Sequence, residues 1–174
     1  MAISARILEN GLIRCQTCGQ EKDLSLFAKS QERRNPLKRA YLCKACNAQK
    51  THEYRNTETG FWVSIWNNLT GNAKVRGLEV GINKQDIINI WKSQKGLCAL
   101  TGLPMQLVQA KRINRTRNLN HYRASVDRID SERGYHKDNI RLVCAYVNIM
   151  RSDMTDEQLR FWCEAILKGP KNGN

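Results

Sequence analysis

The stretch SVDRID, residues 125–130, places two carboxylates, Asp127 and Asp130, on either side of Arg128 and Ile129. It lies in the first of two short apolar-rich runs, ASVDRI (124–129) and NIRLVC (139–144), which are separated by polar, turn-forming residues. Such a pattern predicts two strands of a hairpin joined by a long loop. The following residues, CAYVNIMR (144–151), are predicted to continue as a helix, giving the order strand, strand, helix.

Helices are also predicted on both sides of the hairpin. Apolar residues recur at helical spacing over 61–73, and Gly77 supplies a stop. A second helix is predicted over 84–95, with Asn83 as its N-cap. An amphipathic helix is predicted to end the chain just before Gly169. The tryptophans are expected to lie in the core and not to stack on bases: Trp62, Trp66, Trp91 and Trp162.

The composition points to a polyanionic partner. The chain has 174 residues and a formal net charge of +13, and a cationic surface binds nucleic acid by releasing counterions from phosphates. A basic protein without such a partner, or one that visits anionic membranes, is the alternative. No apolar run approaches the roughly 20 residues of a membrane span, and the N-terminus does not resemble a signal peptide. We therefore expect DNA as partner, no membrane insertion and a cytoplasmic location.

Four of the seven cysteines form two C-x-x-C pairs, CQTC (15–18) and CKAC (43–46). Two thiolates at this spacing chelate one ion from a tight turn, and two such turns complete the tetrahedral set that zinc prefers. A redox motif or chance buried cysteines are the alternatives. Cys15, Cys18, Cys43 and Cys46 are therefore predicted to hold one structural Zn²⁺, which orders a segment with few large apolar residues.

Basic residues cluster in two places. One is the cysteine segment, where a phosphate-contacting face is expected from Lys38, Arg39, Lys44, Lys50 and Arg55. The other is the acid-free stretch 109–123, which is predicted to be an exposed loop that faces phosphates. Its basic residues are Lys111, Arg112, Arg115, Arg117 and Arg123.

From residue 96 to 163 the sequence resembles HNH nucleases of the ββα-metal type, in the phage and bacterial group with an S-[LV]-D-R-I-D signature. The resemblance rests on GLCALTG (96–102), SVDRIDSERGY (125–135), NIRLVCAYVN (139–148) and MR (150–151). The cysteine segment resembles the treble-clef modules that accompany phage endonucleases of the endonuclease VII type. The resemblance implies an α+β protein with a zinc module at 12–56, a helical linker at 57–96 and a nuclease domain at 97–168.

The resemblance also implies roles for particular residues. Asp127 and Asn148 would hold a catalytic Mg²⁺ or Mn²⁺, which binds a phosphate oxygen and stabilises the leaving 3′ oxygen. Related enzymes carry a second zinc site on two knuckles that flank the hairpin. Here only Cys98 and Cys144 remain of it, so they are expected to pack as small buried residues.

The general base is the open question. Where the wider family has a histidine, this chain has Arg128, which cannot accept a proton at neutral pH. Asp130 is the favoured replacement, His136 the second choice and His121 the last. Two alternatives stay open: attack by a metal-bound or substrate-assisted hydroxide, and a protein that binds DNA without cutting it.

Two further loop residues belong to the candidate catalytic set. Arg128 is expected either to hold a phosphate oxygen or to form an ion pair with Asp130 or Glu132. Asn139 is expected to tie the loop through side-chain hydrogen bonds. The favoured function is a metal-dependent DNA endonuclease from phage or mobile-element biology. The alternative is a zinc-containing nucleic-acid-binding protein on a catalytically silent HNH scaffold.

Overall fold

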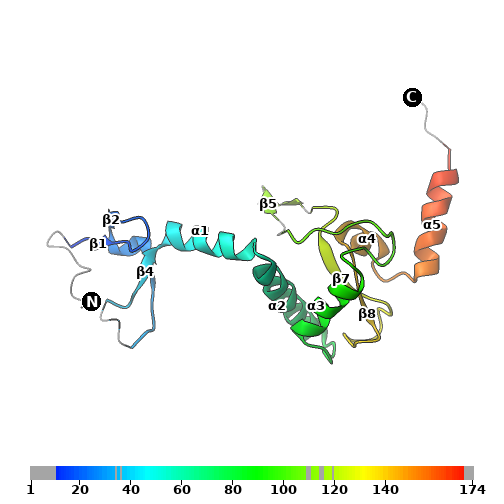
Figure 1. The fold of residues 1–174 in the computed structure, drawn as a ribbon, viewed down its shortest axis with the longest axis horizontal. Coiled ribbons are helices and arrows are strands. Elements are labelled where there is room, and N and C mark those ends of the chain that lie inside the picture. The colour runs from blue at the N-terminus through cyan, green and yellow to red at the C-terminus, as the bar shows by residue number, and fades with distance from the viewer. Residues whose placement is uncertain are drawn as a thin grey trace. The chain divides into compact units, whose positions relative to one another are not determined.

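The computed structural model describes residues 11–33, 35, 37–108, 111–113, 116–118 and 120–170, without the side chains of 111–113 and 116–118. The chain forms two compact units, Met1–Tyr54 and Arg55–Asn174. Helices and short antiparallel strands are present in both, which confirms the α+β class (Figure 1). The finer division into 12–56, 57–96 and 97–168 stays a prediction.

The N-terminal unit contains two small hairpins followed by a helix. β1 (Ile13–Arg14) pairs with β2 (Glu21–Lys22), and β3 (Phe27–Lys29) pairs with β4 (Arg39–Cys43). A short 3₁₀ turn, η2 (Leu24–Leu26), precedes β3, and α1 (Lys44–Arg55) begins directly after β4. The core consists of Ile13, Phe27, Cys15 and Cys43, all at most 1% exposed. So small an apolar core needs a further source of stability, such as a bound metal.

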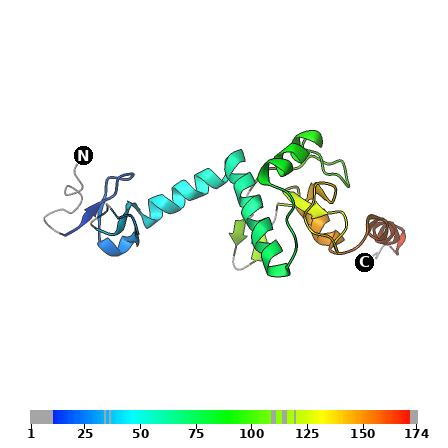
Figure 2. The same cartoon turned by 90° about the horizontal axis from the view of Figure 1, so that it is seen from below.

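The larger unit is built on the predicted hairpin. β7 (Ala124–Arg128) pairs antiparallel with β8 (Ile140–Cys144), and α4 (Ala145–Arg151) follows at once, which confirms the predicted order of strand, strand and helix. α2 (Glu58–Arg76) and α3 (Lys84–Ser93) pack against the hairpin, as Figures 1 and 2 show. α5 (Asp156–Lys168) contacts α4.

The helix ends follow the predicted signals. Gly77 ends α2 in the left-handed conformation, with φ 66°, where a residue with a Cβ would be strained. Asn83 caps α3, and its side chain exchanges hydrogen bonds with Asp86 in a capping box. These ends place the apolar stripe of α2, from Phe61 to Ala73, against the core of the unit.

Two expectations are corrected. Trp62 is buried and Trp66 and Trp91 pack against the core, but Trp162 is 56% exposed. The prediction failed there because the buried residue of α5 is Leu159, near its start, and Trp162 lies on the side of the helix that the core does not cover. The stretch 109–123 is also not a plain loop, because it contains the paired strands β5 (Lys111–Ile113) and β6 (Thr116–Asn118).

Candidate functional site

A polar groove of about 970 Å³ lies in the larger unit. Its walls come from three elements: α2 contributes Ser64, Asn68, Asn72 and Arg76, β7 contributes Ser125 to Arg128, and α4 contributes Asn148, Ile149 and Arg151. Ser131, Tyr135, Ser152 and Asp153 also line it. The hairpin and the helix after it therefore bring Asp127, Arg128 and Asn148, which lie up to 21 residues apart in the sequence, to one groove.

Asp127 lines the groove and is only 3% exposed. Its two carboxylate oxygens accept hydrogen bonds from two arginines: Oδ2 from Nε of Arg141 at 2.8 Å and Oδ1 from Nη1 of Arg151 at 3.0 Å. Arg141 is the cross-strand partner of Asp127 in the β7–β8 register. The two guanidinium groups offset the cost of burying this carboxylate.

Asp156 at the start of α5 completes a ring of four charges. Arg141 donates both terminal nitrogens to Asp156, and Nε of Arg151 donates to Asp156 Oδ1 at 3.2 Å. The hydrogen bonds from Arg141 lower the pKa of Asp156, and the same contact with Asp156 raises the pKa of Arg141. Two aspartates and two arginines leave the ring with no net charge, so it braces β7, β8, α4 and α5 without attracting a counterion.

Asn148, on α4, is oriented by two residues of β7. Its Nδ2 donates to Ser125 Oγ at 2.8 Å and to the carbonyl of Val126 at 3.1 Å. Both amide protons are thereby used, so the atom left for a ligand is the carbonyl oxygen Oδ1. An amide oxygen is one of the ligands that a hard divalent cation prefers.

Arg128, the last residue of β7, and Asn139, the residue before β8, stand at the two ends of the loop between the strands. Nη1 of Arg128 donates to the carbonyl of Arg133 at 2.8 Å, and the guanidinium lies 5.5 Å from the ring centre of Tyr135. Asn139 is 1% exposed, accepts from the N–H of Asp130 and donates to the carbonyls of Asp130 and Gly134. Both side chains therefore hold the loop, and Asn139 uses both of its amide protons and one lone pair of its oxygen in these three bonds.

The bases favoured from the sequence lie elsewhere. Asp130, His136 and His121 are not among the residues that line the groove, although Asp127 and Arg128 are. Oδ1 of Asp130 accepts a hydrogen bond from the backbone N–H of Glu132. The His136 ring lies beside Gly81, and its Nε2 is 3.8 Å from Oε2 of Glu79. The exposed carboxylate in the groove is Asp153.

Sequence reasoning missed Arg141, Arg151, Asp153 and Asp156. The strand register offered a signal for Arg141, because it faces Asp127 across the hairpin. The other three follow the hairpin by several residues, and only the packing of α4 and α5 brings Arg151 and Asp156 into the charge ring and Asp153 into the groove.

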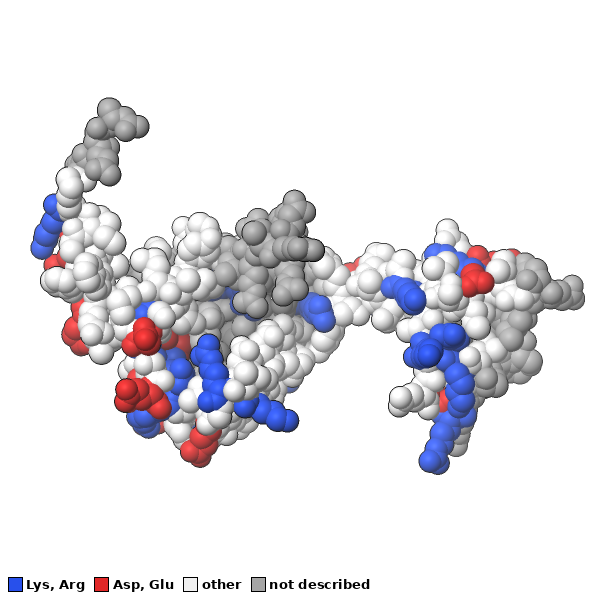
Figure 3. Space-filling model, turned by 180° about the vertical axis from the view of Figure 1, so that it is seen from behind, with Lys and Arg blue, Asp and Glu red and all other residues white. Residues whose placement is uncertain are grey.

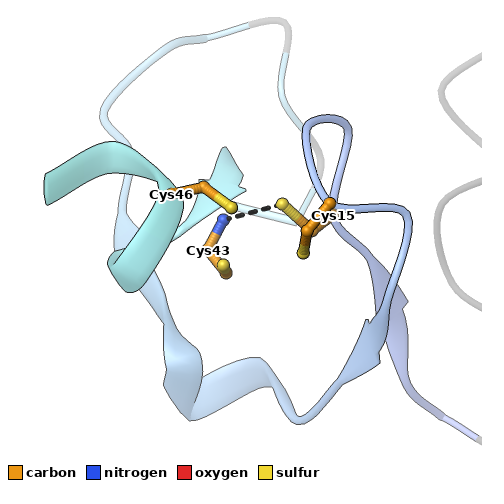
Figure 4. Close-up of side chains that lie close together, drawn as sticks. Cys15, Cys43 and Cys46 are labelled. Atoms are coloured by element: carbon orange, nitrogen blue, oxygen red, sulfur yellow. Dashed lines mark hydrogen bonds between the residues drawn. The ribbon is translucent and has the colours of Figure 1, made fainter. Parts of the chain in front are cut away.

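The four predicted zinc ligands converge in the N-terminal unit. The sulfur atoms of Cys15, Cys18, Cys43 and Cys46 all lie within 4.8 Å of one another, and Figure 4 shows three of these side chains pointing toward a common centre. Tetrahedral zinc–sulfur bonds of about 2.3 Å need sulfur atoms roughly 3.8 Å apart. The cluster therefore fits a zinc ion.

The surroundings of the cluster lower the pKa of Cys15 and of Cys43, whereas the hydrogen bond with the neighbouring Cys43 and burial raise the pKa of Cys46 to about 12. Burial opposes ionisation of Cys15, but hydrogen bonds from the backbone of Cys43, Cys18 and Thr17 lower its pKa to about 6. Lys22 Nζ lies 3.7 Å from the sulfur of Cys43 and supplies a positive charge next to the cluster. Four thiolates around one Zn²⁺ carry a net charge of −2, which this ammonium group partly offsets.

The larger unit repeats the backbone of this cluster. In the zinc cluster the N–H of Cys15 donates to the carbonyl of Gln20, and the N–H of Gly19 donates to the carbonyl of Cys15. The N–H of Cys43 donates to the sulfur of Cys15 at 3.4 Å. In the larger unit the N–H of Cys98 donates to the carbonyl of Leu103, and the N–H of Gly102 donates to the carbonyl of Cys98. The N–H of Cys144 donates to the sulfur of Cys98 at 3.3 Å. Both glycines are left-handed, with φ 68° for Gly19 and 70° for Gly102.

Thr101 and Val147 occupy the places that Cys18 and Cys46 have in the zinc cluster. Cys98 and Cys144 are 2% and 3% exposed, which confirms that they pack as small buried residues. Burial and the neighbouring Cys98 raise the pKa of Cys144 to about 11, so its thiol stays protonated. Two cysteines without further ligands do not make a structural zinc site.

The predicted DNA-contacting residues are scattered. Lys38 is exposed at the turn before β4, and Arg39 begins that strand. Arg123 lines the groove, but its Nε donates to Val108 and its guanidinium lies 5.4 Å from the ring centre of Phe61. The backbones of Lys111, Arg112 and Arg117 lie in β5 and β6, and Arg115 falls outside the described residues. On the face in Figure 3, acidic side chains lie among the lysines and arginines of the larger unit.

Comparison with known proteins gives one structural similarity. No protein-family model and no curated protein sequence matches the chain. A solved structure of the rare-cutting HNH restriction endonuclease PacI is similar over 89% of this chain and 93% of its own, with 22% identity and a TM-score of 0.44. In the described part of this chain, no helix is both long and apolar enough to cross a membrane.

Proposed function

We propose that this protein is a metal-dependent DNA endonuclease that hydrolyses phosphodiester bonds, with the polar groove as its substrate site. The observation that carries the proposal is the meeting of Asp127 from β7 and Asn148 from α4 in one groove that also contains arginine side chains. The resemblance of 125–151 to HNH nucleases supports the same reaction and an origin in phage or mobile-element biology.

The residues of the groove fit a hard divalent cation. Asn148 has its Oδ1 unused, and the Asp127 carboxylate has about four lone-pair sites, of which the arginines take two. Mg²⁺ is commonly bound through one or two protein oxygens together with water and substrate phosphate. When bound there, Mg²⁺ or Mn²⁺ would supply positive charge to a phosphate oxygen and to the leaving 3′ oxygen.

The chain's own residues would do the remaining work. Arg128 lines the groove and keeps N–H groups beyond the one bonded to Arg133, so it would contact a nonbridging phosphate oxygen. Asp153 would orient the attacking water and take its proton, because it is the exposed carboxylate of the groove. Asp130 and His136 stay second choices, since they lie outside it. Basic side chains such as Lys38, Arg39 and Arg123 would hold the rest of the DNA.

The N-terminal cluster would carry one structural Zn²⁺ and take no part in the chemistry. Four cysteine ligands close the coordination sphere, so no position is left for water or substrate. The ion would instead order the hairpins of this unit, whose apolar core is small.

A second function is favoured by the charge ring. Because both oxygens of Asp127 are bonded to arginine and the ring is neutral, the groove has less attraction for a cation than an unpaired aspartate would give. A zinc-containing nucleic-acid-binding protein on a catalytically silent HNH scaffold is therefore the alternative.

Plasmid cleavage separates the two functions. Wild-type protein should nick or cut supercoiled DNA with Mg²⁺ or Mn²⁺ and not with EDTA. Asn148→Ala should abolish cutting and leave DNA affinity within a few-fold, whereas Asn67→Ala, an exposed amide outside the groove, should cut normally. Wild-type protein that binds DNA but cuts it with none of Mg²⁺, Mn²⁺ or Ni²⁺ would establish the alternative.

A parallel series tests the base. Asp153→Asn should lower the cleavage rate by roughly 10²- to 10⁴-fold, the usual contribution of a positioned base. Normal cutting by Asp153→Asn together with loss of activity in Asp130→Asn or His136→Ala would identify Asp130 or His136, in the loop between the strands, as the general base.

A further inference from the structure

One wall of the groove is a row of side chains on α2. Ser64, Asn68, Asn72 and Arg76 follow one another at intervals of four residues, and all four line the groove. Residues at this spacing lie on the same face of a helix. The row contains two carboxamides and a guanidinium but no acid.

The amides of this row are available to a ligand. Asn68 and Asn72 are exposed, and within the described part of the chain neither carboxamide hydrogen-bonds another residue. An adjacent stripe of the same helix is apolar and packs into the core through Phe61, Leu69 and Ala73. The helix is therefore held rigidly with its polar row toward the same groove as Asp127 and Asn148.

We infer that this row is the sequence-reading wall of the groove: Asn68 and Asn72 contact base edges of the DNA, and Arg76 contacts a phosphate. A carboxamide donates and accepts at once and pairs in a bidentate way with adenine, whereas it adds no charge to attract phosphates in general. The guanidinium of Arg76, at the end of the row, is charged and binds phosphate, which is the same in every sequence. The inference rests on the proposed DNA substrate and names the residues that would select its sequence.

The dimensions of the row suit stacked bases. Residues four apart on a helix are about 6 Å apart along its axis. Successive bases of one strand are separated by about 3.4 Å, so the two asparagines would reach positions about two base steps apart. The whole row from Ser64 to Arg76 extends about 18 Å, or roughly five base steps.

The test is selection from a library of DNA duplexes with a randomised segment, with bound and cut molecules sequenced separately. Asn68→Ala and Asn72→Ala should each remove the preference at one or two base positions, about two steps apart, by on the order of 10- to 100-fold. Affinity for unrelated DNA should stay within two-fold. Arg76→Ala should instead weaken binding to all sequences alike and reduce the salt dependence.

Asn67→Ala is the matched control, because Asn67 is an exposed asparagine on the same helix that does not line the groove. The inference is overturned if both groove variants select the wild-type sequences, if Asn67→Ala shifts the preference equally, or if wild-type protein has no preference. Sequences recovered from the bound molecules test the base-reading row independently of whether the protein cuts DNA. Selective binding that depends on Asn68 and Asn72, without any cutting, would support the row while rejecting the endonuclease.

Discussion

At the scale of the residue, the carboxylate of Asp127 would have two roles, as a metal ligand and as a partner of buried arginines. As a metal ligand it would need lone pairs toward the groove, and as part of the charge ring it neutralises Arg151, which is 2% exposed. The second role is structural: Arg151 also donates to the carbonyls of Arg128 and Ile129 and so ties α4 to the end of β7. Loss of activity in an Asp127 variant is therefore poor proof of metal binding, and Asn148 is the cleaner probe.

We predict that Asp127→Ala unfolds about 3–5 kcal/mol more easily than wild type, because it removes one of the two carboxylates that pair with the buried Arg151 and leaves the ring with an excess positive charge. Urea denaturation followed by circular dichroism measures this difference. Asp153→Ala, which removes an exposed carboxylate from the same groove, should change stability by less than about 0.5 kcal/mol. Asp127→Ala combined with Arg151→Met should recover part of the loss. If Asp127→Ala is as stable as wild type, the ring does not brace the fold.

At the scale of the element, the chain uses one arrangement twice: a knuckle, a hairpin strand and a helix that begins right after a cysteine. β4 ends at Cys43 before α1, and β8 ends at Cys144 before α4. In the first copy four sulfur atoms meet, whereas in the second only those of Cys98 and Cys144 remain, and the exposed Thr101 and the partly buried Val147 stand in the other two places. The second copy keeps its backbone without an ion because Leu142, Val143 and Phe61 belong to the same buried core.

The repeat predicts that Thr101→Cys combined with Val147→Cys creates a second zinc site. The backbone bonds of the knuckle are already in place, so the two added thiols should complete a set of four with Cys98 and Cys144. Elemental analysis should show one more zinc per chain than wild type. The single variants, which supply three sulfurs, are the controls. An unchanged zinc content in a folded double variant would mean that the second copy has lost the geometry as well as the ligands.

At the scale of the whole molecule, the two units differ in what stabilises them. The N-terminal core has four fully buried members, two of which are cysteines, whereas the core of the larger unit has 15 buried residues from helices and strands. We therefore expect the first unit to depend on a bound metal ion and the second on apolar burial. A net charge of +13 is spread over both.

Removal of zinc should accordingly unfold one unit and spare the other. Cys43→Ser combined with Cys46→Ser should lose the bound zinc and make residues 12–56 sensitive to protease, while the fragment from about residue 55 onward resists digestion. Mass spectrometry of a limited digest identifies the surviving fragment. Cys98→Ala should keep its zinc and an intact N-terminal unit. A full complement of zinc in the double serine variant would place the ion elsewhere.

The charge of the molecule predicts a steep salt dependence of DNA binding. The logarithm of the association constant should fall almost linearly with the logarithm of salt concentration, because each phosphate contact releases a counterion. Neutralising Arg112, Arg115 and Arg117 together should lower the slope and weaken binding to unrelated sequences equally. Fluorescence anisotropy at several salt concentrations measures both effects, and an affinity independent of salt would remove the electrostatic basis for binding.

Local features were predictable from the residues alone. The hairpin of 124–144, the caps at Asn83 and Gly77, the start of α4 after Cys144 and the convergence of the four cysteines all follow from short-range rules. Hydrophobic period, capping preference and metal-ligand spacing act within a few residues, so the linear sequence contains them.

Partnerships across the fold were not predictable in this way. Asp127 bonds Arg151, the exposed carboxylate of the groove is Asp153 and not Asp130, and Trp162 lies on the surface. Each outcome depends on where α2, α4 and α5 pack relative to the hairpin, and that packing is decided by the burial of apolar faces from distant parts of the chain. A tetrapeptide such as DRID carries its charges wherever it is placed, but its partners exist only after the helices have packed around it.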